Sequence, residues 1–512
     1  MAEKRSILIV GGGTAGWLTA AYLARFLALG RNPHLDIAVL ESPEIGTIGV
    51  GEGAFPTIRA TLQFLGIDEA RFVRATTATF KQGIRFNDWL HAPHDGGRHS
   101  YLHPFEAPLY ADGAGLVPYW LLQDEATRPP FAEAVTIQNR VAEGRRGPKR
   151  LGEEAFGGPL SYAYHFDAHR LGEVLAERAV ELGVRHIADT FDAVALTADG
   201  QIDHVATRAH GRLTADLFVD CTGLRAGLIG GALGEPLHSV REHLFVDRAV
   251  ACKVPYARPD APLESVTIAT AHEAGWTWDI GLAGARGIGT VYSSMHLSDD
   301  RASDILQAYV GRDVPIEPRI LSFEPGYRAR SWIGNCVAVG LAAGFLEPLE
   351  STGLVLIEAA VAMIAELFPH NGPIDGPSAR YNRLMSGRFE TIVNFLKLHY
   401  CLSQRPESFW RDHADPTSIP PALAELLAQW RYRPPNRFDF TLDLESFAFF
   451  NYQYILYGMR FRTELARGRD EYPLGEEAER LFARIRAFGE HAVADLPLHR
   501  ALIDEFVRAA RT

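Results

Sequence analysis

Three glycines near the start of the chain have the spacing of a loop that binds the phosphates of a dinucleotide. Gly11, Gly13 and Gly16 form a G-x-G-x-x-G pattern, with Thr14 and Ala15 between the last two. The first glycine allows a tight turn, the second lets the backbone approach a pyrophosphate, and the third lets a helix pack on a strand. A helix that begins at this loop directs its N-terminal N–H groups at the phosphates. The alternative is a Gly-rich loop without a ligand.

The segments around this loop are those that such a site requires. The apolar residues 7–10 predict a buried strand, residues 17–27 a helix, and residues 35–40 a second strand that ends at Glu41. An acidic side chain at that strand end can accept hydrogen bonds from a ribose, which favours FAD or NAD over NADP. The order of strand, loop, helix and strand therefore predicts a Rossmann-like nucleotide-binding module.

The rest of the chain predicts how this module is completed. Residues 214–219 and 336–339 read as further buried strands, residues 352–367 as an apolar helix, and the pattern is mostly helical from residue 378. The charged stretch EGRRGPKR, residues 143–150, is expected to be an exposed loop. We expect an α/β fold with an inserted substrate-facing sheet in residues 1–377 and a helical part in residues 378–512 that completes a substrate pocket.

Composition excludes several classes of protein. The 512 residues are 47% hydrophobic and 22% charged, as in soluble globular proteins. Lys and Arg number 51 against 63 Asp and Glu, a net charge of −12, which disfavours binding to nucleic acid. The four cysteines form no C-x-x-C pair, which indicates neither a metal site nor a disulfide framework and fits a reducing cytoplasm. No apolar stretch is long enough to span a membrane.

Five segments resemble, in the same order, the flavin-dependent halogenases related to tryptophan halogenases. They are GGGTAGW at Gly11–Trp17, IGVGEG at Ile48–Gly53, FKQGIRF around Lys81, YHFD at Tyr164–Asp167 and GFLEPLESTG at Gly344–Gly353. The resemblance implies the fold of the flavin monooxygenases, FAD that a separate flavin reductase supplies in reduced form, and the use of O₂ with chloride or bromide. Gly51, Glu52 and Gly340 would then join the glycine loop and Glu41 around FAD.

The resemblance also assigns two catalytic residues and a halide site. Lys81 would hold hypohalous acid by hydrogen bonding or be converted to a haloamine, and the alternative is a solvated surface lysine. Glu350 would orient the halogenating species or accept the proton of the aromatic ring. Its alternative role is that of a capping carboxylate at the start of the adjacent helix, where the helix dipole also favours an acidic side chain. Backbone N–H groups of Thr352 and Gly353 would bind the halide.

A tryptophan-rich segment is where the sequence departs from the family pattern. The family marker W-x-W-x-I-P lies between flavin and substrate. Here residues 275–282 read GWTWDIGL, so Trp276 and Trp278 match and Gly281 replaces the proline. The two tryptophans alternate along an expected strand, so both would point to one face as a wall or as core residues.

The expected substrate pocket rests on four more residues. His103 and Phe105 match the spacing that lines the indole pocket in tryptophan halogenases. Tyr452 and Tyr454 lie in an aromatic run that resembles the region holding the amino-acid group of tryptophan, although Gln453 stands where a second tyrosine is expected. Most aromatic residues of this run are expected in the core.

Three functions remain open at this point. The first is halogenation of an electron-rich aromatic, above all an indole or a tryptophan-like compound. Lys81, Glu350 and the paired tryptophans favour this function. The second is an FAD-dependent aromatic monooxygenase, and the third a non-catalytic FAD-binding protein. The natural substrate, the position halogenated, the halide preference, the reductase and the oligomeric state, including a homodimer, stay undecided.

Overall fold

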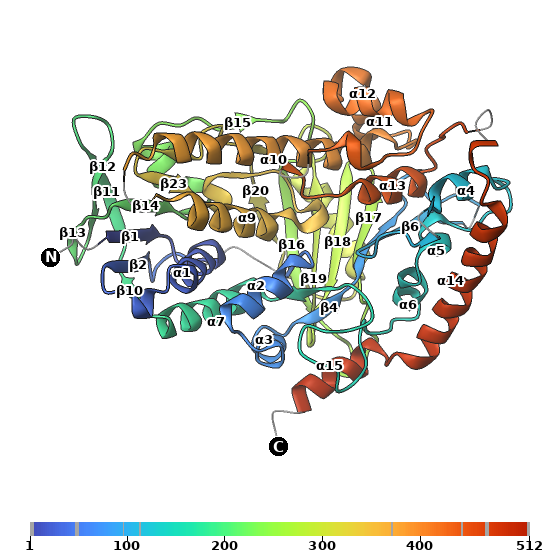
Figure 1. Ribbon diagram of the computed structural model, residues 1–512, viewed down its shortest axis with the longest axis horizontal. Helices are drawn as coiled ribbons and strands as arrows, with labels where there is room; N and C mark the ends of the chain where they lie inside the picture. The colour runs from blue at the N-terminus through green and yellow to red at the C-terminus, as the bar shows by residue number, and fades with distance from the viewer. Residues whose placement is uncertain are drawn as a thin grey trace. The chain divides into compact units, whose positions relative to one another are not determined.

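The computed structural model describes residues 5–46, 51–95, 97–111, 114–369, 372–441, 444–465 and 470–508 (Figure 1). The chain forms two compact units, each built from three segments. The first unit comprises Met1–Ala78, Phe166–Arg241 and Phe323–Glu390, and the second Thr79–His165, Glu242–Ser322 and Thr391–Thr512. The division expected at residue 377 assigns functions rather than packing units and stays a prediction.

The first unit is centred on a six-stranded sheet. Its strands, in spatial order, are β10 (Arg185–Ala188), β2 (Leu35–Glu41), β1 (Arg5–Val10), β14 (Leu217–Asp220), β23 (Cys336–Ala338) and β22 (Trp332–Ile333). All neighbours are parallel except β22, which is antiparallel to β23. Counted along the chain, the five parallel strands have the order 3-2-1-4-5 of a doubly wound sheet. Such folds bind ligands beyond the strand ends where the order reverses, which here is between β1 and β14.

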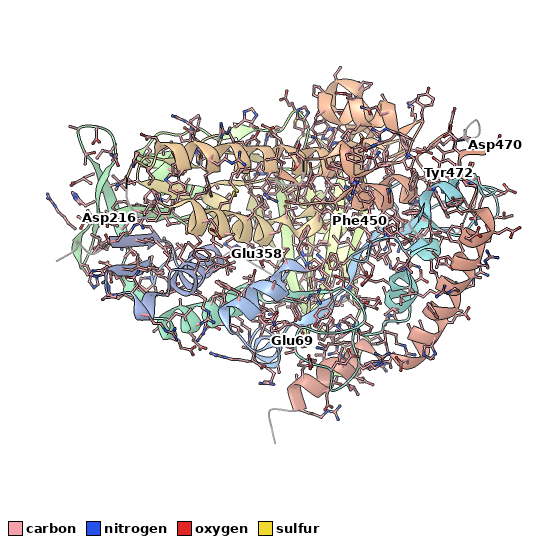
Figure 2. All side chains as sticks on the ribbon, viewed as in Figure 1. Glu69, Asp216, Glu358, Phe450, Asp470 and Tyr472 are labelled. Carbon is pink, nitrogen blue, oxygen red and sulfur yellow. The ribbon has the colours of Figure 1, made fainter. Side chains whose placement is uncertain are left out.

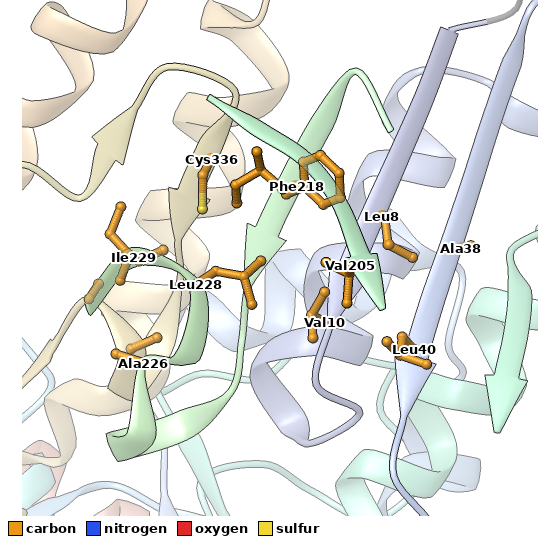
Figure 3. Packing of buried hydrophobic residues seen from close by; sticks show 14 of the residues in the cluster. Leu8, Val10, Ala38, Leu40, Val205, Phe218, Ala226, Leu228, Ile229 and Cys336 are labelled. Carbon is orange, nitrogen blue, oxygen red and sulfur yellow. The ribbon is translucent and has the colours of Figure 1, made fainter. Parts of the chain in front are cut away.

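Apolar strands and helices make the core of this unit. Helix α1 (Thr14–Phe26) packs on β1 and β2 and against α7 (Ala168–Glu181) and α9 (Thr352–Leu367). Figure 3 shows Leu8 and Val10 of β1 in one cluster with Phe218, Leu228 and Ile229. Parallel strands that are covered on both faces need such continuous apolar runs, which is why residues 7–10 could be recognised as a strand.

Smaller elements complete the first unit. They are two three-stranded sheets, β11 (Phe191–Leu196), β12 (Ile202–Thr207) and β13 (Gly211–Leu213), then β15 (His238–Ser239), β21 (Gly326–Tyr327) and β24 (Gly344–Phe345), with the strand β3 (Glu52–Gly53) and helices α2 (Thr57–Leu65) and α3 (Glu69–Ala75). Glu358 of α9, labelled in Figure 2, accepts hydrogen bonds from the hydroxyls of Thr57 at 2.6 Å and Thr61 at 2.5 Å. This buried carboxyl group therefore joins α9 to α2.

The second unit contains the inserted sheet that the sequence predicts. Its seven strands, in spatial order, are β20 (Arg319–Ser322), β16 (Arg248–Pro255), β19 (Ala285–Tyr292), β18 (Gly275–Gly281), β17 (Thr267–His272), β5 (Gly83–Asn87) and β6 (Ser100–Pro104). Neighbouring strands are antiparallel, except that β17 and β5 are parallel. The three-residue strand β4 (Thr79–Lys81) pairs separately with β9 (Ala163–Phe166).

Helices surround this sheet and dominate the C-terminal part. Helix α8 (Asp299–Val310) packs on β16 and β19, α13 (Phe449–Gly458) on β6, and α14 (Gly475–Asp495) against α5 (Phe131–Val135) and α6 (Gln138–Glu143). The others are α4 (Val117–Leu122), α11 (Ser408–Ala414), α12 (Pro421–Trp430) and α15 (His499–Arg508), while α10 (Asp375–Cys401) contributes to both units. The expected α/β class with a helical C-terminal part is confirmed. No helix in the described ranges is long and apolar enough to cross a membrane.

Two sequence-based expectations need correction. The strand expected from residue 214 begins only at Leu217; just before it, the carboxylate of Asp216 accepts hydrogen bonds from the N–H and hydroxyl of Ser6. The stretch EGRRGPKR is not exposed throughout, since Gly147–Lys149 are buried. The N–H of Gly147 donates to the carbonyl of Pro497 at 2.9 Å, so the segment that leads into α15 covers this loop.

Candidate active site

The three glycines of the motif in the loop between β1 and α1 differ in what surrounds them. At Gly11, φ is +115° and a Cβ would lie 2.2 Å from the carbonyl oxygen of Cys221, so the fold tolerates only glycine there. At Gly16, a Cβ would lie 1.8 Å from the carbonyl oxygen of Gly11, so close packing of helix on strand requires glycine. At Gly13, by contrast, φ is −75° and no atom lies within 4 Å of a Cβ position. The second glycine faces open space at the start of α1, where a phosphate group could approach the backbone.

Glu41, at the end of β2, is held over this loop. Its carboxylate accepts the indole N–H of Trp17 at 3.4 Å and lies 2.9 Å from Nε2 of His186. The side chain comes so close to the loop that a Cβ at Gly12 would lie 2.2 Å from its Cδ. The carboxylate thus stands oriented at the sheet edge where a ribose hydroxyl is expected.

Two more segments reach the same edge of the sheet. Gly340, just after β23, has φ +69°, and a Cβ there would lie 2.7 Å from the Cβ of Ala15 in α1. Thr14 donates its hydroxyl to the carbonyl of Ala168 at 3.4 Å. The structure therefore brings the expected FAD residues Thr14, Ala15 and Gly340 to the start of α1.

The segment that contains Gly51 and Glu52 is described only in part, because Ile48–Val50 lie outside the described residues. Gly51 has φ +122°, a conformation that other residues rarely adopt. Burial, with a smaller effect of the charge on Asp167, raises the pKa of Glu52 to about 7. Glu52 is thus a carboxyl group that can be protonated near neutral pH.

The turn before α9 holds Glu350 in an unusual conformation. Glu350 and Ser351 have φ values of +63° and +57°, so two consecutive residues other than glycine are left-handed. Such residues store conformational strain and are enriched at functional sites. Glu350 is 3% exposed, and Ser351, not Glu350, is the N-cap residue of α9. The glutamate therefore stands one residue before the N-cap position of α9.

The same turn presents backbone N–H groups at a helix start. Thr352 is buried, whereas Gly353 is exposed and no atom lies within 4 Å of its Cβ position. Successive N–H groups around a left-handed turn form a concavity that suits an anion, and the helix dipole adds to the attraction. The geometry at Thr352 and Gly353 is compatible with a halide.

In the second unit, Lys81 ends β4 and pairs in register with Ala163 of β9. Its side chain is 0% exposed, which excludes the solvated surface lysine. The Nζ atom lies 5.5 Å from the ring centroid of Phe105. Burial, and to a lesser extent the charge of Lys81, lowers the pKa of His165 well below its ordinary value, so this neighbour is neutral. The structure thus brings Lys81 and the expected pocket residue Phe105 together.

Trp276 and Trp278 of β18 lie on one face of the sheet, with ring centroids 6.3 Å apart. The indole N–H of Trp276 donates to the hydroxyl oxygen of Tyr400 at 3.0 Å. Trp278 covers Gly289 of β19 so closely that a Cβ there would lie 2.2 Å from its Cζ2. Both rings are nearly fully buried, so they form a fixed wall.

The residue that replaces the family proline, Gly281, is enclosed on two sides. Thr79, two residues before Lys81, donates its hydroxyl to the carbonyl of Gly281. The hydroxyl of Tyr256 lies 2.9 Å from the Cβ position of Gly281, in space that a larger residue would need. Glycine and Tyr256 are therefore complementary at this position.

The expected substrate residues do not all lie together. His103 and Tyr454 are neighbours, with ring centroids 6.1 Å apart, and Nε2 of His103 is 2.9 Å from Oδ1 of Asn451. Tyr452, two residues before Tyr454 on α13, packs between Phe395 and other core rings and is 1% exposed. Its surroundings are those of a core residue.

Sequence reasoning missed the residues that support these side chains. Tyr256, Tyr400 and His499 lie far in sequence from the groups they contact, and no local pattern marks them. Among the described residues, no three His, Cys, Asp or Glu side chains are grouped so that they could hold a metal ion.

The doubly wound sheet and the glycine loop are those of a dinucleotide-binding protein, and comparison with known proteins shows the class. A sequence model of the tryptophan halogenase family matches residues 6–470. The chain is 38% identical to the 7-chloro-L-tryptophan 6-halogenase KtzR of Kutzneria sp. over 455 residues, which cover 84% of this chain and 86% of that protein. It is 36% identical to the tryptophan 6-halogenase SttH of Streptomyces toxytricini over 451 residues, 84% of each chain.

Solved structures agree with the sequence matches. The tryptophan halogenase from Shewanella frigidimarina superposes with a TM-score of 0.94 at 40% identity, covering 99% of this chain and 98% of the other. BrvH, a flavin-dependent halogenase from Brevundimonas sp. BAL3, superposes with a TM-score of 0.87 at 32% identity, covering 98% and 99%. The chain belongs to the tryptophan halogenase family and is a flavin-dependent halogenase. The expected class of enzyme is confirmed, while the roles of individual residues stay predictions.

Proposed function

We propose that the protein uses reduced FAD, supplied by a separate flavin reductase, with O₂ and chloride or bromide to halogenate an indole or a tryptophan-like aromatic. The observation that carries the proposal is the complete burial of Lys81 beside the ring of Phe105. Burying an ammonium group is costly, so a fold retains one where it has partners or a function. A donor in such dry surroundings interacts with a polar ligand more strongly than it would in water.

The residues present fit the cofactor. The open space at Gly13 leaves room for a pyrophosphate, and the oriented carboxylate of Glu41 can accept a ribose hydroxyl. Gly51, Glu52 and Gly340 would hold the remainder of FAD. When bound in reduced form, FAD would supply, with O₂, the oxidising equivalents that turn a halide into hypohalous acid. Backbone N–H groups of Thr352 and Gly353 would bind that halide.

The chain's own side chains would then direct the transfer of halogen. Lys81 would donate a hydrogen bond to the oxygen of hypohalous acid. As a ring carbon forms its bond to halogen, the O–X bond would break and the oxygen would take the proton of Lys81 and leave as water. Glu350 would accept the proton that the same ring carbon releases. His103, Phe105, Trp276, Trp278 and Tyr454, with Tyr452 behind them, would surround the aromatic substrate.

The test is mass spectrometry of products formed by the purified protein with FAD, a generic flavin reductase, NADH, air and bromide. Indole, tryptophan and a phenol are offered as substrates. A product with the isotope doublet of bromine is expected from at least one indole. Hydroxylated product without bromine would support a monooxygenase instead, and FAD binding without any product would mean either a substrate larger than those offered or the non-catalytic alternative.

A matched pair of lysine variants ties the result to the site. Lys81→Ala is expected to lower brominated product by about a hundredfold or more while FAD still binds. Lys149 is the control, because it is also a buried lysine, 1% exposed, and its Nζ donates to the carbonyl of Glu154 at 2.6 Å. Lys149→Ala should keep the activity of the folded protein.

Glu350→Gln should slow turnover strongly, and an unchanged rate would leave Glu350 only an electrostatic role at the helix start.

A further inference from the structure

The strand that carries Lys81 is only three residues long, and three different partners fix the backbone at Thr79, at Phe80 and just after the strand end. Thr79 donates its hydroxyl to the carbonyl of Gly281. After the strand, the N–H of Gln82 donates to the carbonyl of Ser265 at 2.7 Å. Between them, the N–H of Phe80 donates to Nε2 of His499 at 2.9 Å. The partner of this backbone group is therefore a side chain 419 residues further along the chain.

The strand pairing explains why Phe80 needs such a partner. Phe80 stands opposite Tyr164 of β9, and an N–H that bonds to His499 points away from β9. In an antiparallel pair the hydrogen-bonded positions alternate, so Thr79 and Lys81 are the residues whose backbone can bond to β9. A buried N–H that points out of a ladder requires an acceptor from elsewhere.

The imidazole of His499 is suited to act as that acceptor. It is 0% exposed, and burial lowers its pKa to about 4, so the ring is neutral at physiological pH. A neutral imidazole has one acceptor nitrogen, and the contact with Phe80 assigns this role to Nε2, which leaves the hydrogen on Nδ1. The rings of Phe80 and His499 also pack, with centroids 6.0 Å apart, and Phe506 of α15 lies 5.7 Å from Phe80.

The residue after His499 fixes the same helix to the sheet. Arg500 donates to the carbonyl of Ala261 at 2.9 Å and to the carbonyl of Ala283 in the turn between β18 and β19. Its guanidinium carbon lies 5.0 Å from the ring of Tyr256, the residue that faces Gly281. The start of α15 thus connects the lysine strand with the turn that follows the two tryptophans.

We propose that His499 is a positioning residue for Lys81: by accepting the N–H of Phe80 it fixes the strand from which the lysine side chain extends. In this arrangement the effect of His499 passes through the backbone of Phe80. The consequence for catalysis rests on the proposed function of Lys81, whereas the positioning itself does not.

Two substitutions separate the acceptor from the bulk of the side chain. His499→Leu keeps an apolar side chain of similar size but removes the acceptor, while the amide oxygen of His499→Gln can take the position of Nε2. Halogenated product per flavin oxidised is expected to fall about tenfold in the leucine variant and to be largely restored in the glutamine variant. His204→Leu is the control, because it removes a buried histidine from β12 of the first unit.

A second measurement tests, without turnover, how well the side chain of Lys81 is protected from a reagent. Full-length wild type and variants are treated briefly with an amine-acylating reagent, and labelling of each lysine is followed by mass spectrometry. Lys397 serves as the internal reference, since it is 0% exposed and its Nζ is 2.9 Å from Nδ1 of His413, at a place remote in sequence from β4. His499→Leu should raise labelling of Lys81 about tenfold and leave Lys397 protected.

The outcomes distinguish this proposal from the one on which it rests. Equal labelling of Lys81 in wild type and His499→Leu, or a rise for Lys81 and Lys397 alike, would overturn the positioning role. A glutamine variant as impaired as the leucine variant would also overturn it. If wild type forms no halogenated product but Lys81 labelling still responds to His499→Leu and not to His499→Gln, the positioning role stands and the proposed function fails.

Discussion

The indole N–H of Trp276 donates a hydrogen bond of 3.0 Å to the hydroxyl of Tyr400. Tyr400 in turn stacks on the imidazole of His413, with ring centroids 4.3 Å apart and planes within 14°. The orientation of a tryptophan in the family marker therefore depends on a tyrosine of α10, which the marker itself does not include.

Removing this acceptor should loosen the tryptophan wall. Tyr400→Phe leaves the buried N–H of Trp276 unpaired, so the free energy of unfolding should fall by about 1–3 kcal/mol. Product per flavin oxidised should fall as well. The control is Tyr457→Phe, which also removes one buried hydroxyl but whose contact with Thr463 is long, at 3.4 Å. Denaturant unfolding of both variants checks the prediction, and equal losses would contradict it.

The open space at Gly13 predicts a variant that folds but binds FAD poorly. Gly13→Ala meets no atom within 4 Å and needs no left-handed φ, so its stability should equal that of wild type. The added methyl group occupies the approach to the pyrophosphate and should raise the Kd for FAD at least about tenfold. Gly16→Ala, whose Cβ would lie 1.8 Å from the carbonyl oxygen of Gly11, should instead be unstable. Flavin titration and thermal unfolding distinguish the two; tight FAD binding by Gly13→Ala would contradict the role of this glycine.

Restoring the family proline should fail unless Tyr256 changes with it. The N–H of Leu282 donates to the carbonyl of Ala285, so Gly281 and Arg286 form the next, non-hydrogen-bonded pair and a proline loses no bond to β19. The obstacle is the hydroxyl of Tyr256, 2.9 Å from the Cβ position. Gly281→Pro should therefore cost about 1–3 kcal/mol of stability.

A double variant tests whether the hydroxyl of Tyr256 is the obstacle to proline at position 281. Gly281→Pro with Tyr256→Phe should recover most of the lost stability, because the oxygen that clashes is gone. Product per flavin oxidised, measured for wild type and the double variant, then reports whether the proline changes coupling. A double variant no more stable than Gly281→Pro alone would show that Tyr256 is not the obstacle.

Because Lys397 is buried, we expect the free energy of unfolding to rise with pH. Burial lowers its pKa from 10.5 to about 7 in the folded protein. Between these values the unfolded chain binds more protons than the folded chain, so the free energy of unfolding increases as pH rises through this range. From pH 7 to pH 9 the contribution is about 2 kcal/mol.

The measurement is urea unfolding of wild type and Lys397→Met at both pH values. The substitution should abolish that increment, whereas Lys253→Met, at an exposed position of β16, should retain it. An increment that survives in Lys397→Met would mean that another group causes the dependence.

Local patterns predicted the elements that carry the cofactor loop. The continuous apolar runs of β1 and α9 and the glycine spacing before α1 depend on residues within one or two turns of each other, and the structure has these elements where they were expected. The burial of Lys81 could also be inferred, since its apolar neighbours Phe80 and Ile84 are adjacent in sequence.

The supporting contacts could not be predicted in this way. The left-handed backbone at Glu350 and Ser351 could not be predicted from residue type, because glutamate and serine rarely adopt this conformation. Tyr256 facing Gly281 and His499 facing Phe80 are products of the tertiary fold alone. A single sequence contains no periodicity that joins such distant positions.

The distance along the chain between Phe80 and His499 also has a consequence for biosynthesis. The acceptor for the Phe80 N–H emerges from the ribosome 419 residues after the donor, a delay on the order of half a minute at ordinary rates of synthesis. Until then a nascent chain can contain Lys81, the two tryptophans and the complete seven-stranded sheet, yet lack the contact that fixes the lysine strand. If hypohalous acid is the halogenating species, this order of synthesis delays assembly of the site that controls an oxidant until nearly all of the described chain has been made.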